Sequence, residues 1–76
     1  MLAKLLDILD RAYKTGEYIS TDEALGFIGF IKLVYLFDGY YKVVVVSEHT
    51  EFTITNDNMF TIIDETKRYI TSFLLA

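Results

Sequence analysis

The chain has 76 residues, no cysteine and a formal net charge of −4. Hydrophobic residues make up 53% of it, which argues against intrinsic disorder and indicates one compact domain over residues 1–76. Without cysteine, disulfides and thiolate metal sites are excluded, and we expect a reducing compartment, the cytoplasm. The longest apolar run, residues 24–37, contains Lys32 and falls short of the roughly 20 residues that span a bilayer, so we expect no membrane association.

The N-terminal segment shows the periodicity of an amphipathic helix. Its apolar residues recur at steps of three and four: Leu2, Leu5, Leu6, Leu9, Ala12 and Tyr13. Acidic residues precede basic ones by four positions in Asp7–Arg11 and Asp10–Lys14, the order that stabilises a helix. Gly16 is a natural end for this helix.

The segment after Ser20 allows two interpretations. Ser20 with Glu23 has the form of a capping box, so one alternative is a second helix spanning about residues 21–37. Gly26 and Gly29 disfavour a helix there, and the residues that follow are mostly β-branched or aromatic. We therefore favour a single helical turn over residues 21–25, followed by a strand.

A β-hairpin is predicted next. Asp38-Gly39 stands between two runs rich in valine and aromatic residues, the pattern of a two-residue type I′ turn. The expected strands are residues 28–37 and 40–47, with Phe37 facing Tyr40 and Val34 facing Val43. In this register one face carries Lys32, Val34, Leu36, Tyr41, Val43 and Val45, and the other carries Ile31, Leu33, Tyr35, Phe37, Tyr40, Lys42, Val44 and Val46.

A third strand and a last helix complete the prediction. Residues 51–55 alternate between apolar and polar side chains, as a half-exposed edge strand does. Asn58 can cap a helix whose inward side comprises Met59, Ile62, Ile63, Thr66, Tyr69, Ile70, Phe73 and Leu74. The expected fold is α+β: a three-stranded antiparallel meander packed against N- and C-terminal helices.

Two helices can cover one face of this sheet, which leaves the other face in need of a partner. Both faces of the predicted hairpin are largely apolar. We therefore expect a homodimer, the commonest arrangement for a small chain of this kind. The residues expected at this hydrophobic interface are Tyr35, Phe37, Tyr40 and Tyr41. The same face could instead make the protein a dimerisation or adaptor module for another protein.

The sequence offers no recognisable catalytic group of residues. His49 is the only histidine, and Glu48 and Glu51 beside it form no usual set of metal ligands. Ser20, Ser47 and Ser72 lie outside any nucleophile motif. We therefore expect a non-enzymatic protein without cofactor or metal.

The charge distribution is the most informative functional feature. Residues 1–15 carry a net charge of +1, residues 58–76 a net charge of 0, and residues 16–57 a net charge of −5. The acids of this middle segment are Glu17, Asp22, Glu23, Asp38, Glu48, Glu51 and Asp57. Acids at turns also serve solubility alone. The functional interpretation is a surface that binds a basic protein, such as a nucleoid or other DNA-binding protein, by mimicking DNA, and that does not bind nucleic acid itself. In size, acidity and lack of catalytic groups, the chain resembles the small host-takeover or inhibitor proteins of bacterial viruses.

Overall fold

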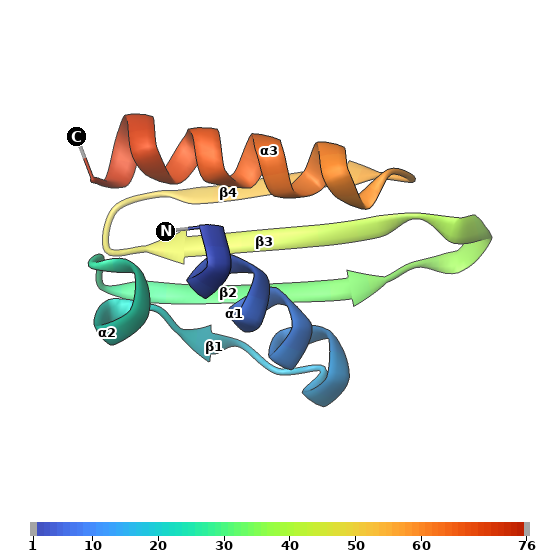
Figure 1. Cartoon of the computed structure of the whole chain (residues 1–76), viewed down its shortest axis with the longest axis horizontal. Helices are drawn as coiled ribbons and strands as arrows, with labels where there is room; N and C mark the ends of the chain where they lie inside the picture. Colours follow the sequence, from blue (N-terminus) through green and yellow to red (C-terminus); the bar gives the residue numbers. More distant parts are fainter. Residues whose placement is uncertain (1, 76) are drawn as a thin grey trace.

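The computed structural model describes residues 2–75 as a four-stranded antiparallel sheet with two long helices (Figure 1). The strands are β1 (Ile19–Ser20), β2 (Gly29–Tyr35), β3 (Tyr41–Ser47) and β4 (Glu51–Asn56), which pair in the order β1-β2-β3-β4. The helices are α1 (Leu2–Thr15), the single turn α2 (Asp22–Leu25) and α3 (Met59–Tyr69), which continues as a π-helical turn over Ile70–Leu74. The predicted α+β class with helices at both ends is confirmed, and the sheet has four strands rather than three.

Helix α1 ends before Gly16 and helix α3 begins after Asn58, as the sequence predicts. The Gly16 N–H donates to the carbonyl oxygen of Ala12 at 2.9 Å, and its φ of 68° ends α1 in the left-handed conformation that glycine adopts without strain. At the start of α3, the Asn58 side-chain oxygen accepts hydrogen bonds from the backbone N–H groups of Phe60 and Thr61. The two predicted ion pairs of α1 are present at 3.7 and 3.0 Å.

The segment from residue 21 to residue 37 adopts the favoured arrangement of one turn followed by a strand, so the alternative long helix is wrong. Gly26, with a φ of 81°, ends α2 after four residues. The Ser20 hydroxyl bonds to Asp22 instead of capping a helix. Strand β1 is missing from the prediction because its two residues are too few to show a pattern. Ile19 of β1 pairs with Ile31 of β2.

The hairpin between β2 and β3 forms, but the predicted register is wrong by one residue. Tyr35 faces Tyr41 and Leu33 faces Val43, because a three-residue turn, Phe37–Gly39, replaces the two-residue turn. Asp38 and Gly39 both have positive φ, as expected from their residue types. A shift of one residue moves the side chains of one strand to the opposite face of the sheet.

The observed register separates apolar and charged residues where the predicted one mixes them. The covered face, the face beneath the helices, carries Ile31, Leu33, Tyr35, Tyr41, Val43, Val45, Phe52 and Ile54. The open face carries Phe30, Lys32, Val34, Lys42, Val44, Val46, Glu51, Thr53 and Thr55. In the predicted register each face would hold one lysine, so covering either face would bury a charge at a large cost.

The core lies between the covered face and the two long helices. Helix α1 crosses β2, and α3 contacts β3 and β4 (Figure 1). The fully buried residues of this layer include Leu5, Ile8, Ile31, Val43, Val45, Ile62 and Ile70. Gly29 allows the start of β2 to approach the backbone of β3 closely, since a Cβ there would lie 2.1 Å from the carbonyl oxygen of Val46.

One residue of the predicted inward side of the last helix is misplaced. Phe73 is 73% exposed, whereas Ile70 is fully buried. The backbone between them is π-helical, which takes more residues per turn than an α-helix, so the α-helical spacing no longer predicts which side chains point inward. Phe73 instead lies beside Tyr69, with ring centroids 5.3 Å apart.

Candidate functional site

One hollow, which we call the terminal cleft, lies at the end of the sheet where α2 and the β3–β4 turn meet the C-terminal turn of the last helix. Its volume is about 540 Å³. Three chain segments line it: residues 26–28, residues 47–50, and Tyr69, Phe73 and Leu74. These segments are distant in the sequence and meet only because β2, β3 and α3 all start or end at this side of the molecule (Figure 1).

The wall of the terminal cleft on the side of residues 26–28 and the last helix is apolar. Phe27 is almost fully buried and joins the core, whereas Ile28 is 65% exposed. Phe73 and Leu74 add apolar surface from the π-helical turn. Single exposed apolar side chains are common on protein surfaces and indicate nothing by themselves. Several of them around one hollow are typical of a binding site.

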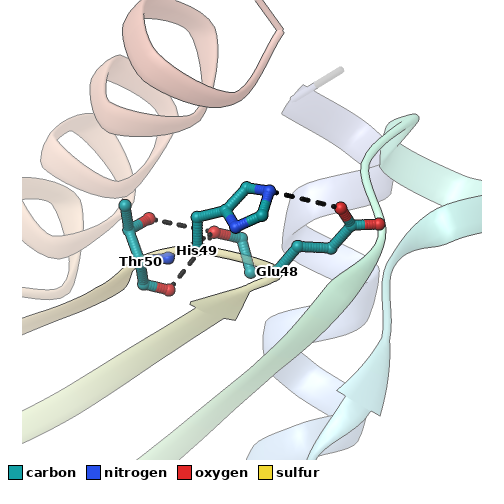
Figure 2. A network of polar contacts seen from close by, with 4 residues as sticks. Glu48, His49 and Thr50 are labelled. Atoms are coloured by element: carbon teal, nitrogen blue, oxygen red, sulfur yellow. Dashed lines mark hydrogen bonds and ion pairs between the residues drawn. The ribbon is translucent and has the colours of Figure 1, made fainter.

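The polar part of the lining is the β3–β4 turn. Ser47 N–H donates to the Thr50 carbonyl oxygen at 2.9 Å, which closes a two-residue turn with Glu48 and His49 at its tip. Figure 2 shows the His49 ring directed toward Glu48, with its Nε2 atom 3.6 Å from Glu48 Oε2. The hydroxyl of Thr50 lies 2.6 Å from the Tyr69 hydroxyl and fixes this turn against α3.

The hydroxyl groups of this turn bond to one another and to the last helix. The Thr50 hydroxyl contacts Ser47 and Tyr69, and within residues 2–75 no hydrogen bond joins it to the exposed ring of His49. A nucleophile activated by a base needs such a bond. The described residues also contain no group of three or more His, Asp or Glu side chains able to hold a metal ion.

The structure divides the seven predicted acidic site residues between the two ends of the molecule. The strand order places Asp22, Glu23, Glu48 and Glu51 at the end with the terminal cleft. It places Glu17, Asp38 and Asp57 at the other end, where α1 and β2 end and α3 begins (Figure 1). Only Glu48 of the seven lines the terminal cleft itself. The seven acids of a single chain are therefore divided between two ends of the molecule.

Asp22, in the first turn of α2, accepts hydrogen bonds that favour its charged form. The Ser20 hydroxyl donates to Asp22 Oδ1 at 2.6 Å and lowers the pKa of this carboxyl, and the backbone N–H of Glu23 adds to the effect. Asp22 therefore keeps its negative charge to lower pH than an ordinary aspartate. Thr21, next to it, is buried and donates its hydroxyl to the Phe27 carbonyl oxygen, which connects α2 to the cleft wall.

The predicted aromatic interface residues do not share an uncovered face. Tyr35 and Tyr41 point to the covered face, with ring centroids 5.3 Å apart, while Phe37 and Tyr40 belong to the hairpin end. Tyr41 also lines a smaller apolar cleft of about 250 Å³ between α1 and α3, together with Tyr13. The open face therefore carries neither Tyr35 nor Tyr41, unlike the tyrosine-bearing open face expected from the predicted register.

No family model, curated protein sequence or solved structure matches this chain. No helix within residues 2–75 has the length and apolar character needed to cross a membrane.

Sequence reasoning missed the apolar half of the terminal cleft. Phe73 was assigned to the core from helical spacing, and Ile28 was assigned to a strand that in fact begins at Gly29. The only available signal was the Gly26–Gly29 segment, whose two glycines indicate an irregular backbone at this point.

Proposed function

We propose that this protein is a binding module that holds a basic segment of another protein in the terminal cleft. The observation that supports this proposal is the pairing of an exposed apolar wall, including Ile28 and Phe73, with an acidic end bearing Asp22, Glu23, Glu48 and Glu51. An apolar anchor residue would occupy the cleft, and flanking Lys or Arg side chains would lie near the carboxylates.

The partner class that we favour is a DNA-binding protein. Such proteins carry Lys and Arg clusters that contact phosphates, and an acidic end of this kind attracts the same side chains. Occupying them would keep the partner off DNA, so the module would act as an inhibitor that mimics DNA charge. Duplex DNA should then compete with the module for the partner, whereas a stable complex of all three would contradict mimicry.

A peptide titration tests the cleft directly. The probe is a short labelled peptide with a central phenylalanine flanked by arginines, and its affinity is measured by fluorescence anisotropy. Glu48→Lys should weaken binding roughly tenfold or more, with the loss shrinking as salt is added. Glu17→Lys is the matched control, because it makes the same charge change in an exposed residue that does not line the cleft.

The apolar wall needs its own variant. Phe73→Ser should also weaken binding, and this loss should persist at high salt because apolar contacts are not screened. Equal losses from Glu48→Lys and Glu17→Lys, with none from Phe73→Ser, would show that the peptide responds to overall charge and not to the cleft.

A further inference from the structure

Strand β4 forms a long edge of the sheet and lacks the protective residues that are common in such strands. At the other edge, β1 has only two residues, whereas β4 has six. Natural edge strands are commonly protected by lysine, proline or a bulge. The sequence of β4, EFTITN, contains neither lysine nor proline, its pairing with β3 is continuous, and its one charge is Glu51 at the start.

The β3–β4 turn determines which backbone N–H and C=O groups of β4 point away from β3 and are free to pair with another strand. Ser47 and Thr50 form a hydrogen-bonded pair, and such pairs alternate with non-bonded pairs along an antiparallel ladder. Phe52, Ile54 and Asn56 therefore bond to β3. The backbone N–H and C=O groups of the alternate residues, Glu51, Thr53 and Thr55, point outward, and no strand within residues 2–75 pairs with this side.

We infer that β4 pairs antiparallel with β4 of a second copy of this chain, about a two-fold axis at Thr53. In this register Thr53 faces Thr53 of the second copy, and Glu51 faces Thr55 in both directions. It is the one antiparallel register that uses all three outward-facing residues of each strand, giving about six backbone hydrogen bonds. The result is a continuous sheet across both copies, and the inference does not depend on the proposed function.

We call the contact between the two β4 strands the seam. Charges on the open face complement each other across it. Thr55 is paired with Lys42 in β3, so Glu51 of the second copy would lie two strand spacings, roughly 10 Å, from Lys42 at the backbone. The long side chains of lysine and glutamate can span that distance over a threonine. Symmetry makes this contact twice, and it keeps the two Glu51 side chains apart.

Apolar side chains also meet on the covered face. Phe52 of one copy would lie beside Ile54 of the other, and both are only half-buried in the single chain. Helix α3 contacts both β3 and β4. The proposed pairing would therefore place the α3 helices of the two copies on the same face of the extended sheet, one on each side of the two-fold axis.

Analytical ultracentrifugation of the full chain tests the seam. We expect the wild type to sediment as a dimer of the 8.8 kDa chain at tens of micromolar, on the order of common dimer affinities. Thr53→Lys places two like charges opposite each other and should raise the dissociation constant roughly a hundredfold. Thr53→Gln, the uncharged control at the same exposed position, should remain a dimer. A monomeric wild type, a dimeric Thr53→Lys or a monomeric Thr53→Gln would overturn the inference.

Amide hydrogen exchange gives a second readout that needs no variant. In the dimer, the outward N–H groups of Glu51, Thr53 and Thr55 should be protected, and this protection should fall on dilution. Fast exchange of these three amides at concentrations where the protein is dimeric would place the contact elsewhere and overturn the proposed seam.

Discussion

At the scale of single residues, Ser20 and Asp22 show how a local hydrogen bond sets a charge. The sequence suggested Ser20 as part of a capping box with Glu23, but its hydroxyl donates to Asp22 instead. Side chains of this kind often bond within two residues of themselves, in competition with helix capping. This hydrogen bond lowers the pKa of Asp22, which belongs to the acidic end that we propose for binding.

Removing this hydrogen bond should change the titration of Asp22. Ser20→Ala should raise the pKa of Asp22 toward its ordinary value, 3.8, as measured by NMR of the carboxyl carbon. A folded-state pKa below the unfolded value stabilises the fold above the unfolded pKa, and this contribution is lost as the pH falls through the lowered value. The variant should therefore lose part of its stability at neutral pH and depend less on pH below 3.8. Ser47→Ala, whose hydroxyl bonds to Thr50, should leave the Asp22 titration unchanged.

At the scale of elements, periodicity and capping residues predicted most of the helices and strands. The register between strands depends on contacts between distant residues and was not predicted. Periodicity predicted α1, and the cap at Asn58 predicted the start of α3. The register of β2 with β3 was missed because Asp38-Gly39 was taken as a complete turn, although Phe37 also belongs to it. Of the predicted and the observed register, only the observed one keeps both Lys32 and Lys42 on the open face, where neither charge is buried.

The terminal cleft could not be predicted, because its walls come from segments that no sequence pattern brings together. Helical spacing also placed Phe73 in the core, and only the π-helical turn moves it into the cleft.

The π-helical turn buries Ile70 and exposes Phe73, although α-helical spacing would place both side chains in the core. Substitutions at these two residues should therefore lower the free energy of unfolding by different amounts. Ile70→Ala should lower the free energy of unfolding by about 2–5 kcal/mol, since it leaves a cavity in the core. Phe73→Ala should change it by about 0.5 kcal/mol or less, because this side chain is mostly exposed. Urea denaturation followed by circular dichroism measures both. Similar losses for the two variants would mean that the last turn is α-helical in solution.

At the scale of the whole molecule, the proposed dimer changes how the acidic residues are distributed. Antiparallel pairing of β4 with its copy brings the cleft end of one chain to the same side as the hairpin end of the other. Each end of the dimer would then combine Asp22, Glu23, Glu48 and Glu51 from one chain with the acids Glu17, Asp38 and Asp57 from the other. The acidic surface expected from the sequence would exist in the assembly although a single chain lacks it.

The two proposed contacts should be separable. Thr53→Lys should convert the protein to monomers while each chain still binds the arginine-flanked peptide with nearly wild-type affinity. Glu48→Lys should weaken peptide binding while the sedimenting mass stays that of the dimer. Effects of distant, independent sites are generally additive, so the double variant should show both losses in full. Loss of peptide binding in Thr53→Lys alone would indicate that the second copy completes the cleft.

The strand order also has a consequence for how the chain acquires its structure. Every strand pairs with its neighbour in the chain, a topology of short-range contacts that favours rapid folding. Helix α3, however, follows the sheet and covers Val43 and Val45 only after it has been synthesised. Until α3 packs on the sheet, the covered face is bare and the β4 edge is open, so the interval before this helix docks is when the chain is most prone to aggregate.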